Sequence, residues 1–457
     1  MKKQLKVTAV ALSSVLLLSA CGGKTATTSP SSSPAGNTPA AASAKPIEIT
    51  VWDKPAADNP VKPYLEKQFA AFDAQFPNIK VKHEELATGG KDREQYLTAM
   101  AGGQGPDATP NNPYPDMEKY IKQGFALDIT DRWNSYADKG NYIPSSLEAA
   151  NRDGKVYGVP NDMYVTPLIY NKKLFKEAGL DPAKPPATWD EFVDAAKKLT
   201  DPSKGQIGYN ILGMDWADWF FEYYVWQAGG DLTKKNDDGT ATLTFTSDPA
   251  VTALQFYKDL KWKHKVVQKN VVQSLDDNNK DFYTGHTGMT VGWVDWFTAK
   301  GMDINDIGAM PFPAGPSGKS PSQVGGAYWT INAKTTKEKQ DAAWTYVTFM
   351  SSKNFYDGRL NYTKEIGQFP NLLTFRTDLD TSKIYEGIPA DIVANIKKAA
   401  SDTHLEYFLK DRLSKYVVAA IQKVLLDQNA DPKAELQKQQ DLAQKEVIDK
   451  YNAEVKK

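Results

Sequence analysis

From residue 47 onward, short apolar stretches rich in β-branched residues alternate with amphipathic stretches that have helical spacing. Residues 47–52 (IEITVW) and 78–86 (NIKVKHEEL) predict strands, and between them residues 64–77 place Leu65 and Phe69 on one helical face. Further strand-like and helix-like stretches follow in the same alternation. This pattern predicts an α/β fold with a mostly parallel sheet.

Local signals mark several element ends. Thr188 followed by Glu191 three residues later predicts a capping box at the start of a helix, and Gly179 predicts a helix C-terminus. Asp238-Gly239 predicts a hairpin turn. These signals fix where helices and hairpins begin and end within the α/β pattern.

The amino-terminal residues have the pattern of a bacterial lipoprotein. A basic start (MKKQLK) precedes an apolar run of signal-peptide length that ends in LSAC, which resembles a lipobox. We expect residues 1–20 to be a signal peptide, Cys21 to carry lipid, and residues 21–45, rich in Ser, Thr, Pro, Gly and Ala, to form a disordered tether. The alternative is a plain secretory signal with an incidental cysteine. Lipidation would hold the protein on the extracellular face of the membrane, in a Gram-positive bacterium.

Several kinds of chemistry have no support in the sequence. The net charge of −1 provides no field for nucleic acid, and the four histidines lack metal-ligand spacing. Residues 276–281 (DDNNKD) lack the central Gly and distal Glu of a calcium loop, so we expect a solvent-exposed turn there. No P-loop, nucleophile elbow or dinucleotide fingerprint occurs, and no carboxylate pair is singled out among the 56 acidic residues. We therefore expect no catalytic residue, metal or cofactor.

A long ordered pattern identifies a family. Residues 157–200 contain G-V-P, L-x-Y-N-K, A-G-L, P-x-T-W-D-E and A-A-K-K-L in that order. The stretch resembles the family 1 extracellular solute-binding proteins of ABC importers, the group that includes maltose-binding protein. The resemblance covers about residues 46–457, and Gly288 stands where the family prefers Ala. Four further stretches resemble the family in the expected order, namely 103–130, 226–232, 282–296 and 310–335.

The resemblance implies a two-lobe, periplasmic-binding-protein-like fold of type II, with a hinge and a ligand cleft between the lobes. It also implies a monomer without catalysis that docks on membrane permease subunits. Gly325, Gly326 and Gly367 suit a hinge rotation, although they could simply make turns. The expected crossovers lie near 161–166, 324–329 and 365–371, with lobe one at 46–161 and 329–365 and lobe two at 166–323 and 371–457.

The densest aromatic stretch is 214–226 (MDWADWFFEYYVW). Taken as a helix, its aromatic residues spread over an arc wider than a minimal core stripe. In the resembled family this segment starts at the cleft and runs away from it. Asp215, Trp216 and Trp219 are therefore predicted to face a ligand, and Phe220, Tyr223 and Trp226 to lie in the core.

Sugar sites combine aromatic plates with polar groups that bond hydroxyls. Tryptophan occurs beside Asp or Asn at several expected strand ends and crossovers, where open α/β sheets bind ligands. Each of these residues could instead be core, cap or turn. Besides Asp215, Trp216 and Trp219, the candidate ligand-binding residues are Trp52, Asp53, Lys54, Asn111, Asn112, Tyr114, Asp162, Tyr164, Trp293, Asp295, Trp296, Tyr328, Trp329, Glu365, Gln368, Phe369 and Arg376.

The composition favours a carbohydrate ligand. The chain has 11 Trp and 22 Tyr, whereas arginine, which suits bidentate carboxylate recognition, occurs six times. A neutral oligosaccharide is therefore expected. Because Arg376 and Lys54 could bind a carboxylate, a uronate-bearing sugar remains the alternative ligand. Two other functions stay open: a sugar-binding sensory or adhesive lipoprotein without a transport role, and a surface glycoside hydrolase.

Overall fold

The computed structural model describes residues 45–456 except 86–90, 215 and 370–374. Cys21 and the predicted signal peptide lie outside the described residues, as does Asp215. Residues 45–457 group into one unit. Within the described part of the chain, no helix is both long and apolar enough to span a membrane.

The first sheet has six strands. Its order is β14-β13-β3-β1-β2, and β6 pairs with β13. β1 is parallel to β2 and β3, whereas β13 is antiparallel to both β3 and β6. The strands are β1 (Ile47–Lys54), β2 (Ile79–Glu85), β3 (Ala108–Pro113), β6 (Val159–Val165), β13 (Ser322–Ile331) and β14 (Thr403–His404).

The second sheet has the order β12-β7-β11-β8. β7 is antiparallel to β11 and β12, and β11 is parallel to β8. Both sheets are therefore mixed, so the expectation of a mostly parallel sheet was wrong, because β7 runs antiparallel to β11 and β12 and β13 runs antiparallel to β3 and β6. The strands are β7 (Leu168–Asn171), β8 (Ile207–Tyr209), β11 (Thr287–Val291) and β12 (Ile307–Met310), and two hairpins add β4 (Asn151–Arg152), β5 (Lys155–Val156), β9 (Thr233–Lys235) and β10 (Ala241–Leu243).

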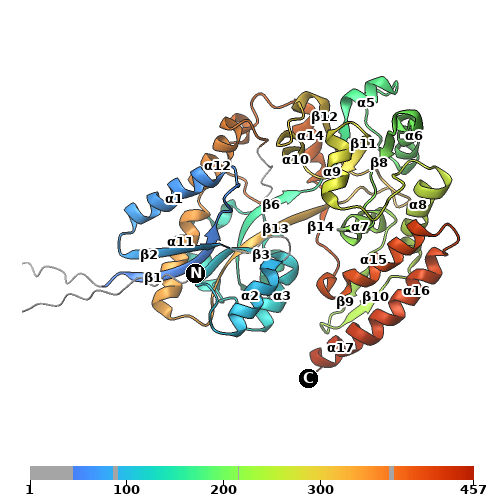
Figure 1. The fold of residues 1–457 in the computed structure, drawn as a ribbon. Helices are drawn as coiled ribbons and strands as arrows, with labels where there is room; N and C mark the ends of the chain where they lie inside the picture. The colour runs from blue at the N-terminus through green and yellow to red at the C-terminus, as the bar shows by residue number, and fades with distance from the viewer. Residues whose placement is uncertain (1–44, 86–90, 215, 370–374, 457) are drawn as a thin grey trace, which may run out of the picture. The chain divides into compact units, whose positions relative to one another are not determined.

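Helices cover both sheets (Figure 1). Those that follow the strands of the first sheet are α1 (Lys62–Gln75), α2 (Lys91–Ala101), α3 (Tyr114–Lys122), α4 (Thr130–Ser135), α11 (Lys337–Met350) and α12 (Lys353–Glu365). The others are α5 (Lys172–Glu177), α6 (Trp189–Leu199), α7 (Ala217–Gln227), α8 (Asp248–Lys258), α9 (Leu275–Tyr283), α10 (Val294–Thr298), α13 (Thr381–Ile384), α14 (Ala390–Ala399), α15 (Lys410–Leu426), α16 (Pro432–Ala443) and α17 (Asp449–Val455).

Strands β6 and β13 carry the chain between the two sheets and run side by side (Figure 1). Tyr164 of β6 pairs with Gly325 of β13, where the ladder register shifts. A Cβ on Gly325 would lie 2.5 Å from the Tyr164 ring, so the glycine is needed for close packing and makes no turn. Two of the expected crossovers, 161–166 and 324–329, fall on this strand pair, and we propose that the lobe boundaries lie there. The third expected crossover, 365–371, ends outside the described residues.

Helix α7 is buried on every side. All its residues from Ala217 to Gln227 are buried, including the predicted core residues Phe220, Tyr223 and Trp226, which confirms that part of the prediction. The sequence predicted that Trp216 belongs to this helix. The helix begins one residue later, because Trp216 has a left-handed backbone with φ of 53°. Trp216 therefore precedes the regular helix, and its ring meets the Trp219 ring edge-on at 5.2 Å.

The local capping signals are largely confirmed. The Thr188 hydroxyl accepts a bond from the Glu191 N–H at 3.3 Å, while the Glu191 carboxylate accepts from Ala187 N–H at 2.7 Å. Gly179 follows α5 with φ of 68°, and the hairpin loop between β9 and β10 contains Gly239. These caps and turns hold the helix ends where the sequence places them.

The predicted exposed turn at 276–281 was wrong, because these residues belong to α9. The Ser274 hydroxyl caps this helix by accepting from the Asp277 N–H at 3.1 Å. Asp276 and Asp277 lie in the first turn, where their negative charges favour the helix dipole. The acidic residues therefore start a helix here.

Gly288 of β11 packs directly on α6. A Cβ at this position would lie 2.8 Å from the Leu199 Cδ1 atom and 3.0 Å from its Cβ. Leu199 is fully buried, so it has little room to move. The departure from the family's alanine is therefore explained by the leucine opposite.

We predict that Gly288→Ala lowers the free energy of unfolding by about 1–3 kcal/mol, because it overpacks this contact. Urea unfolding of the single variants and of Gly288→Ala/Leu199→Ala measures the effect. The decrease in the free energy of unfolding should be smaller in the double variant than the sum of the decreases in the two single variants. Gly140→Ala, where a Cβ meets no neighbour within 4 Å, is the matched control. A loss for Gly288→Ala equal to that of the control would contradict the contact.

Candidate functional site

Four tryptophans and a tyrosine form an aromatic cluster beside the second sheet. Trp293 lies at the centre, with ring centroids 4.4 Å from Trp296, 5.8 Å from Trp219 and 6.4 Å from Trp216. The Tyr164 ring meets Trp293 edge-on at 5.0 Å. Such edge-on and tilted arrangements are favourable for aromatic rings. We call these five residues the tryptophan cluster.

Three separate elements position the cluster. Tyr164 comes from β6, Trp216 and Trp219 come from the start of α7, and Trp293 and Trp296 come from the start of α10. Trp219 and Trp293 are each only 6% exposed, whereas Trp216 is 44% exposed. The buried rings therefore support a platform whose outer plate is the exposed indole of Trp216.

The outer face of this platform lines a cavity of about 500 Å³, which we call the tryptophan pocket. Its size suits a small-molecule ligand. The Asn279 side-chain oxygen is buried and has no hydrogen-bond partner within the described residues. The pocket thus combines aromatic plates with polar groups that can bond hydroxyls. Its lining residues are Trp216, Leu275, Asp276, Asn279, Tyr283, Trp296, Ala299 and Lys300.

Charged side chains lie on the other side of the tryptophan cluster. The Lys410 Nζ atom lies 6.0 Å from the centre of the Trp219 ring and 3.2 Å from a Glu406 carboxylate oxygen. The Tyr407 hydroxyl donates to the Asp218 carboxylate at 2.7 Å. Burial raises the pKa of Glu406, and the nearby Lys410 ammonium opposes this rise. Helices α7 and α15 therefore bring a network of charges to the tryptophans.

Residues of the first sheet's helices reach the same region. Arg93 of α2 pairs with the buried Asp116 of α3 at 3.0 Å. Arg93 also interacts electrostatically with Glu406, and both act on Tyr164, whose pKa is raised mainly by burial. The site is thus bordered by groups from both sheets, as a ligand cleft between lobes requires.

Glu222 in the middle of α7 is a buried acid. Its side chain is fully buried, and neither carboxylate oxygen has a hydrogen-bond partner among the residues that the structure describes. Burial raises its pKa well above the ordinary 4.5, and the nearby acids Asp231 and Glu406 raise it further. The group is therefore neutral in the folded protein over a wide pH range.

Not all predicted site residues meet at the cluster. Tyr164, Trp216, Trp219, Trp293 and Trp296 are brought together, with Asp295 one residue before Trp296. The predicted residues on the first strand have other roles. Trp52 is buried against Tyr96 and donates to Glu84 at 3.1 Å.

Asp53 is likewise used inside the fold. It bonds His83 at 2.7 Å and also accepts from the Tyr346 hydroxyl. Asp162, which has a left-handed backbone, forms a two-bond ion pair with Arg359 of α12. Both carboxylates therefore have partners within the protein, which explains their positions without a ligand.

Further predicted residues are buried in structural roles. Arg376 has a fully buried side chain that bonds Asp378, Asp138 and the Ser351 carbonyl, so it is no ligand group in this structure. Asn112, Tyr328, Trp329 and Phe369 are buried as well. Lys54, Asn111 and Glu365 are exposed and Gln368 is half-buried, while the Tyr114 side chain lies outside what the structure describes.

The sequence reasoning missed several residues of the site. Asp276 and Asn279 were placed in a turn, and Arg93, Glu406 and Lys410 were not singled out. One signal was available: residues 405–410 (LEYFLK) place a Tyr-Phe pair between an acid and a base. The other contacts join parts of the chain that are far apart in sequence.

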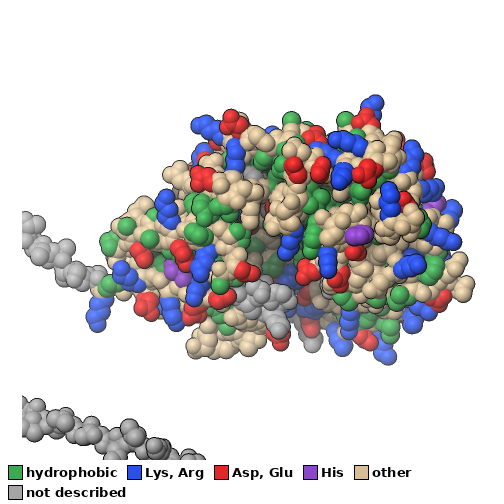
Figure 2. Space-filling model, turned by 45° about the horizontal axis from the view of Figure 1, so that its top comes forward, with side chains coloured by type: hydrophobic (Ala, Val, Ile, Leu, Met, Phe, Trp, Pro, Cys, Tyr) green, Lys and Arg blue, Asp and Glu red, His purple; other side chains and the backbone are tan. Residues whose placement is uncertain are grey.

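The charged side chains on the face drawn in Figure 2 are mixed in sign. Figure 2 shows Lys and Arg side chains mixed with Asp and Glu over the visible face. This mixture agrees with the net charge of −1.

Comparison with known proteins places the chain in a family. Residues 56–354 match the family described as bacterial extracellular solute-binding protein. The galactooligosaccharide-binding protein of Bacillus subtilis is 25% identical over 364 residues, which cover 77% of each chain.

Solved structures give the same fold. The maltose-bound MalE3 of T. maritima superposes with a TM-score of 0.70 at 24% identity, over 87% of this chain and 99% of that one. UgpB from Mycobacterium tuberculosis, in complex with glycerophosphocholine, gives a TM-score of 0.72 at 20% identity, over 89% and 99%.

The fold is therefore the two-lobe fold of the maltose-binding-protein type. The chain belongs to the bacterial extracellular solute-binding protein family. This confirms the family and the fold class that the ordered motifs predicted. The mixed sheets and abundant helices agree with that fold.

We predict that Glu222 makes stability depend on pH. Above about pH 4.5 the unfolded chain releases this proton while the folded protein retains it, so stability falls as pH rises toward the folded pKa. Glu222→Gln cannot ionise and should flatten this fall. Melting temperatures measured from about pH 5 to about pH 8 test it. Exposed Glu365→Gln serves as control, and an unchanged slope in Glu222→Gln would contradict the assignment.

Proposed function

We propose that this protein captures a carbohydrate outside the cell and delivers it to the permease of an ABC importer. The ligand is an oligosaccharide whose neutral rings pack on the tryptophan pocket. The protein itself carries out no catalysis. Lipid on Cys21 holds it at the extracellular face of the membrane.

The exposed indole of Trp216 is the observation that carries this proposal. It is 44% exposed although three other tryptophans pack around it, and it lines the cavity together with Asp276 and Asn279. Pyranose rings present apolar C–H faces to such plates, and their hydroxyls bond carboxylates and amides. The arrangement fits a sugar better than a metal or a free amino acid.

The names of the relatives support a sugar ligand but do not fix the ligand class of this protein. The galactooligosaccharide-binding protein and the maltose-bound MalE3 carry sugars in their names, whereas the equally similar UgpB structure holds glycerophosphocholine. The fold is therefore compatible with more than one ligand class. The tryptophan cluster of this chain is the feature that favours carbohydrate.

Capture would work by lobe closure. Groups from both sheets, such as Arg93 and Glu406, border the site, so a ligand that contacts both favours the closed arrangement. The closed form is the one that docks on the permease. Loss of uptake on gene deletion tests this step, and unchanged uptake would favour the sensory or adhesive alternative. Release of reducing ends from a bound oligosaccharide would indicate the hydrolase alternative instead.

We predict that Trp216→Ala weakens oligosaccharide binding by roughly tenfold to hundredfold, because an exposed stacking plate is lost. A thermal-shift screen against neutral and acidic oligosaccharides identifies the ligand class, and calorimetry then gives the affinity. The fold should stay stable, whereas Trp219→Ala in the core should cost about 3–5 kcal/mol of stability.

Trp262→Ala is the matched control, because Trp262 is half-buried and its indole donates to the Val424 carbonyl at 3.0 Å. This variant should bind sugar normally. Equal affinities for Trp216→Ala and Trp262→Ala would remove the tryptophan pocket as the ligand site. A screen in which no sugar shifts the melting temperature would refute the carbohydrate assignment.

We predict that Cys21→Ser releases the protein from the membrane, because the thiol is the site of lipidation. Cell fractionation and mass spectrometry of the mature amino terminus measure the change. Wild-type protein should carry lipid on Cys21 and remain with the membrane. Recovery of unlipidated wild-type protein from the medium would show a plain secretory signal instead.

A further inference from the structure

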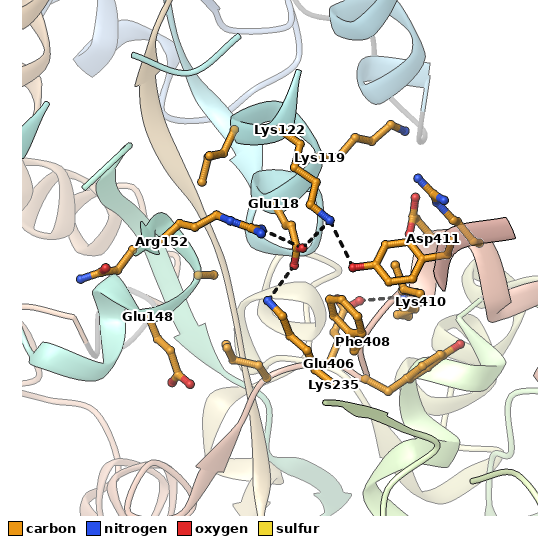
Figure 3. A pocket seen from close by; sticks show the side chains of 18 residues that line it. Glu118, Lys119, Lys122, Glu148, Arg152, Lys235, Glu406, Phe408, Lys410 and Asp411 are labelled. Atoms are coloured by element: carbon orange, nitrogen blue, oxygen red, sulfur yellow. Dashed lines mark hydrogen bonds and ion pairs between the residues drawn. The ribbon is translucent and has the colours of Figure 1, made fainter. Parts of the chain in front are cut away.

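A second cavity, of about 320 Å³, lies where α3 faces residues 405–412 (Figure 3). The β4–β5 hairpin, β9 and α17 also contribute to its wall. Six of its lining residues are Lys or Arg and four are Asp or Glu. We call this cavity the basic pocket.

The positive charge is concentrated around one carboxylate. Glu118 of α3 receives the Arg152 guanidinium at 2.8 Å, the Lys122 ammonium at 3.0 Å and the Lys235 ammonium at 3.2 Å. In Figure 3, Arg152 approaches Glu118 from the left and Lys235 from below. Three cations thus share Glu118, and Arg152 also lies 3.7 Å from the exposed Asp153 carboxylate. The three positive charges exceed these two negative charges.

The pKa of Glu118 agrees with this excess. Burial would raise it, but the bonds from Arg152 and Lys122 lower the pKa to about 2. A carboxylate held ionised to such low pH reports a strongly positive surrounding. A second anion at the same place would meet the field of these cations reduced by the negative charge of Glu118.

The three cations are both held in place and accessible. The Lys122 Nζ atom lies 4.8 Å from the Tyr451 ring centre and 3.2 Å from its hydroxyl, and the Lys235 Nζ atom lies 5.1 Å from the Phe408 ring centre. Yet the side chains remain 38% exposed for Lys122, 29% for Arg152 and 46% for Lys235. They can therefore bond an incoming anion without rearranging.

The basic pocket adjoins the tryptophan cluster. Lys410 and Glu406 line the pocket, and the Lys410 Nζ atom also lies 6.0 Å from the Trp219 ring centre. Tyr407, which lines the pocket too, bonds Asp218 in the first turn of α7. Arg376, by contrast, is fully occupied by internal partners and cannot serve an acidic sugar.

We propose that the basic pocket binds an anionic substituent, a carboxylate, sulfate or phosphate, of the carbohydrate whose neutral rings pack at the tryptophan cluster. Lys122, Arg152 and Lys235 bond the anionic oxygens. The protein therefore selects an oligosaccharide with one acidic group over its neutral counterpart. This inference rests on the proposed function, since it assigns a second contact of the same ligand.

Matched oligosaccharide pairs test the inference. Each pair differs only by oxidation of one hydroxymethyl group to a carboxylate, as between glucose and glucuronate or galactose and galacturonate. Titration calorimetry on the folded protein should show the acidic member of the best pair binding about tenfold more tightly, as charge-assisted hydrogen bonds provide. Added salt should weaken only the acidic member.

Variants then locate the effect. Lys235→Gln should reduce affinity for the acidic member by about threefold to tenfold and leave the neutral member unchanged, and Lys235→Arg should restore much of the preference. Lys184→Gln, at a lysine whose side chain is 85% exposed, is the matched charge control. Circular dichroism and melting temperature check that each variant folds.

Other outcomes overturn the inference. Equal affinity for both members of every pair, or an equal loss for both in Lys235→Gln, would exclude an acidic substituent in this pocket while leaving the proposed function intact. Competition by inorganic sulfate or phosphate alone, without any preference between the sugars, would assign the pocket to a free anion. Absence of binding by every carbohydrate, neutral or acidic, would instead refute the proposed function.

Discussion

Strands β6 and β13 pair antiparallel where the chain passes from one sheet to the other, and the site depends on this pairing. The ladder places Tyr164 opposite Gly325, whose lack of a side chain leaves room for the tyrosine ring close to the strand. From there the ring reaches Trp293 at 5.0 Å. Tyr164 therefore belongs both to the strand that connects the sheets and to the aromatic wall of the site.

Two chemically different surfaces lie near the strands that connect the sheets. The tryptophan cluster provides apolar plates with Asp and Asn at the edge, and the basic pocket provides cations around Glu118. Lys410 and Glu406 stand between them as a bonded pair, which limits the charge that either region imposes on the other. In the binding mode that we propose, one ligand is held by stacking at one end and by charge at the other.

The sequence was a good guide to the fold and to one wall of the site. Ordered motifs identified the family, and the aromatic residues of 216–219 and 293–296 do lie together. It could not show that Trp52 and Trp329 pack against other aromatic rings, or that Arg376 pairs with Asp138, because these partners lie far away in the sequence. For the same reason the meeting of Arg93 with Glu406 could not be predicted.

The close packing of the tryptophan cluster also has an optical consequence. Indoles with ring centres 4.4 to 6.4 Å apart exchange excitation energy, so light absorbed by any of the four can be emitted from one. Trp216 is the most exposed member, whereas Trp296 is half-buried, and the emission of Trp216 responds to the polarity of whatever covers it. The site therefore carries its own fluorescent reporter, which registers occupancy without an attached dye.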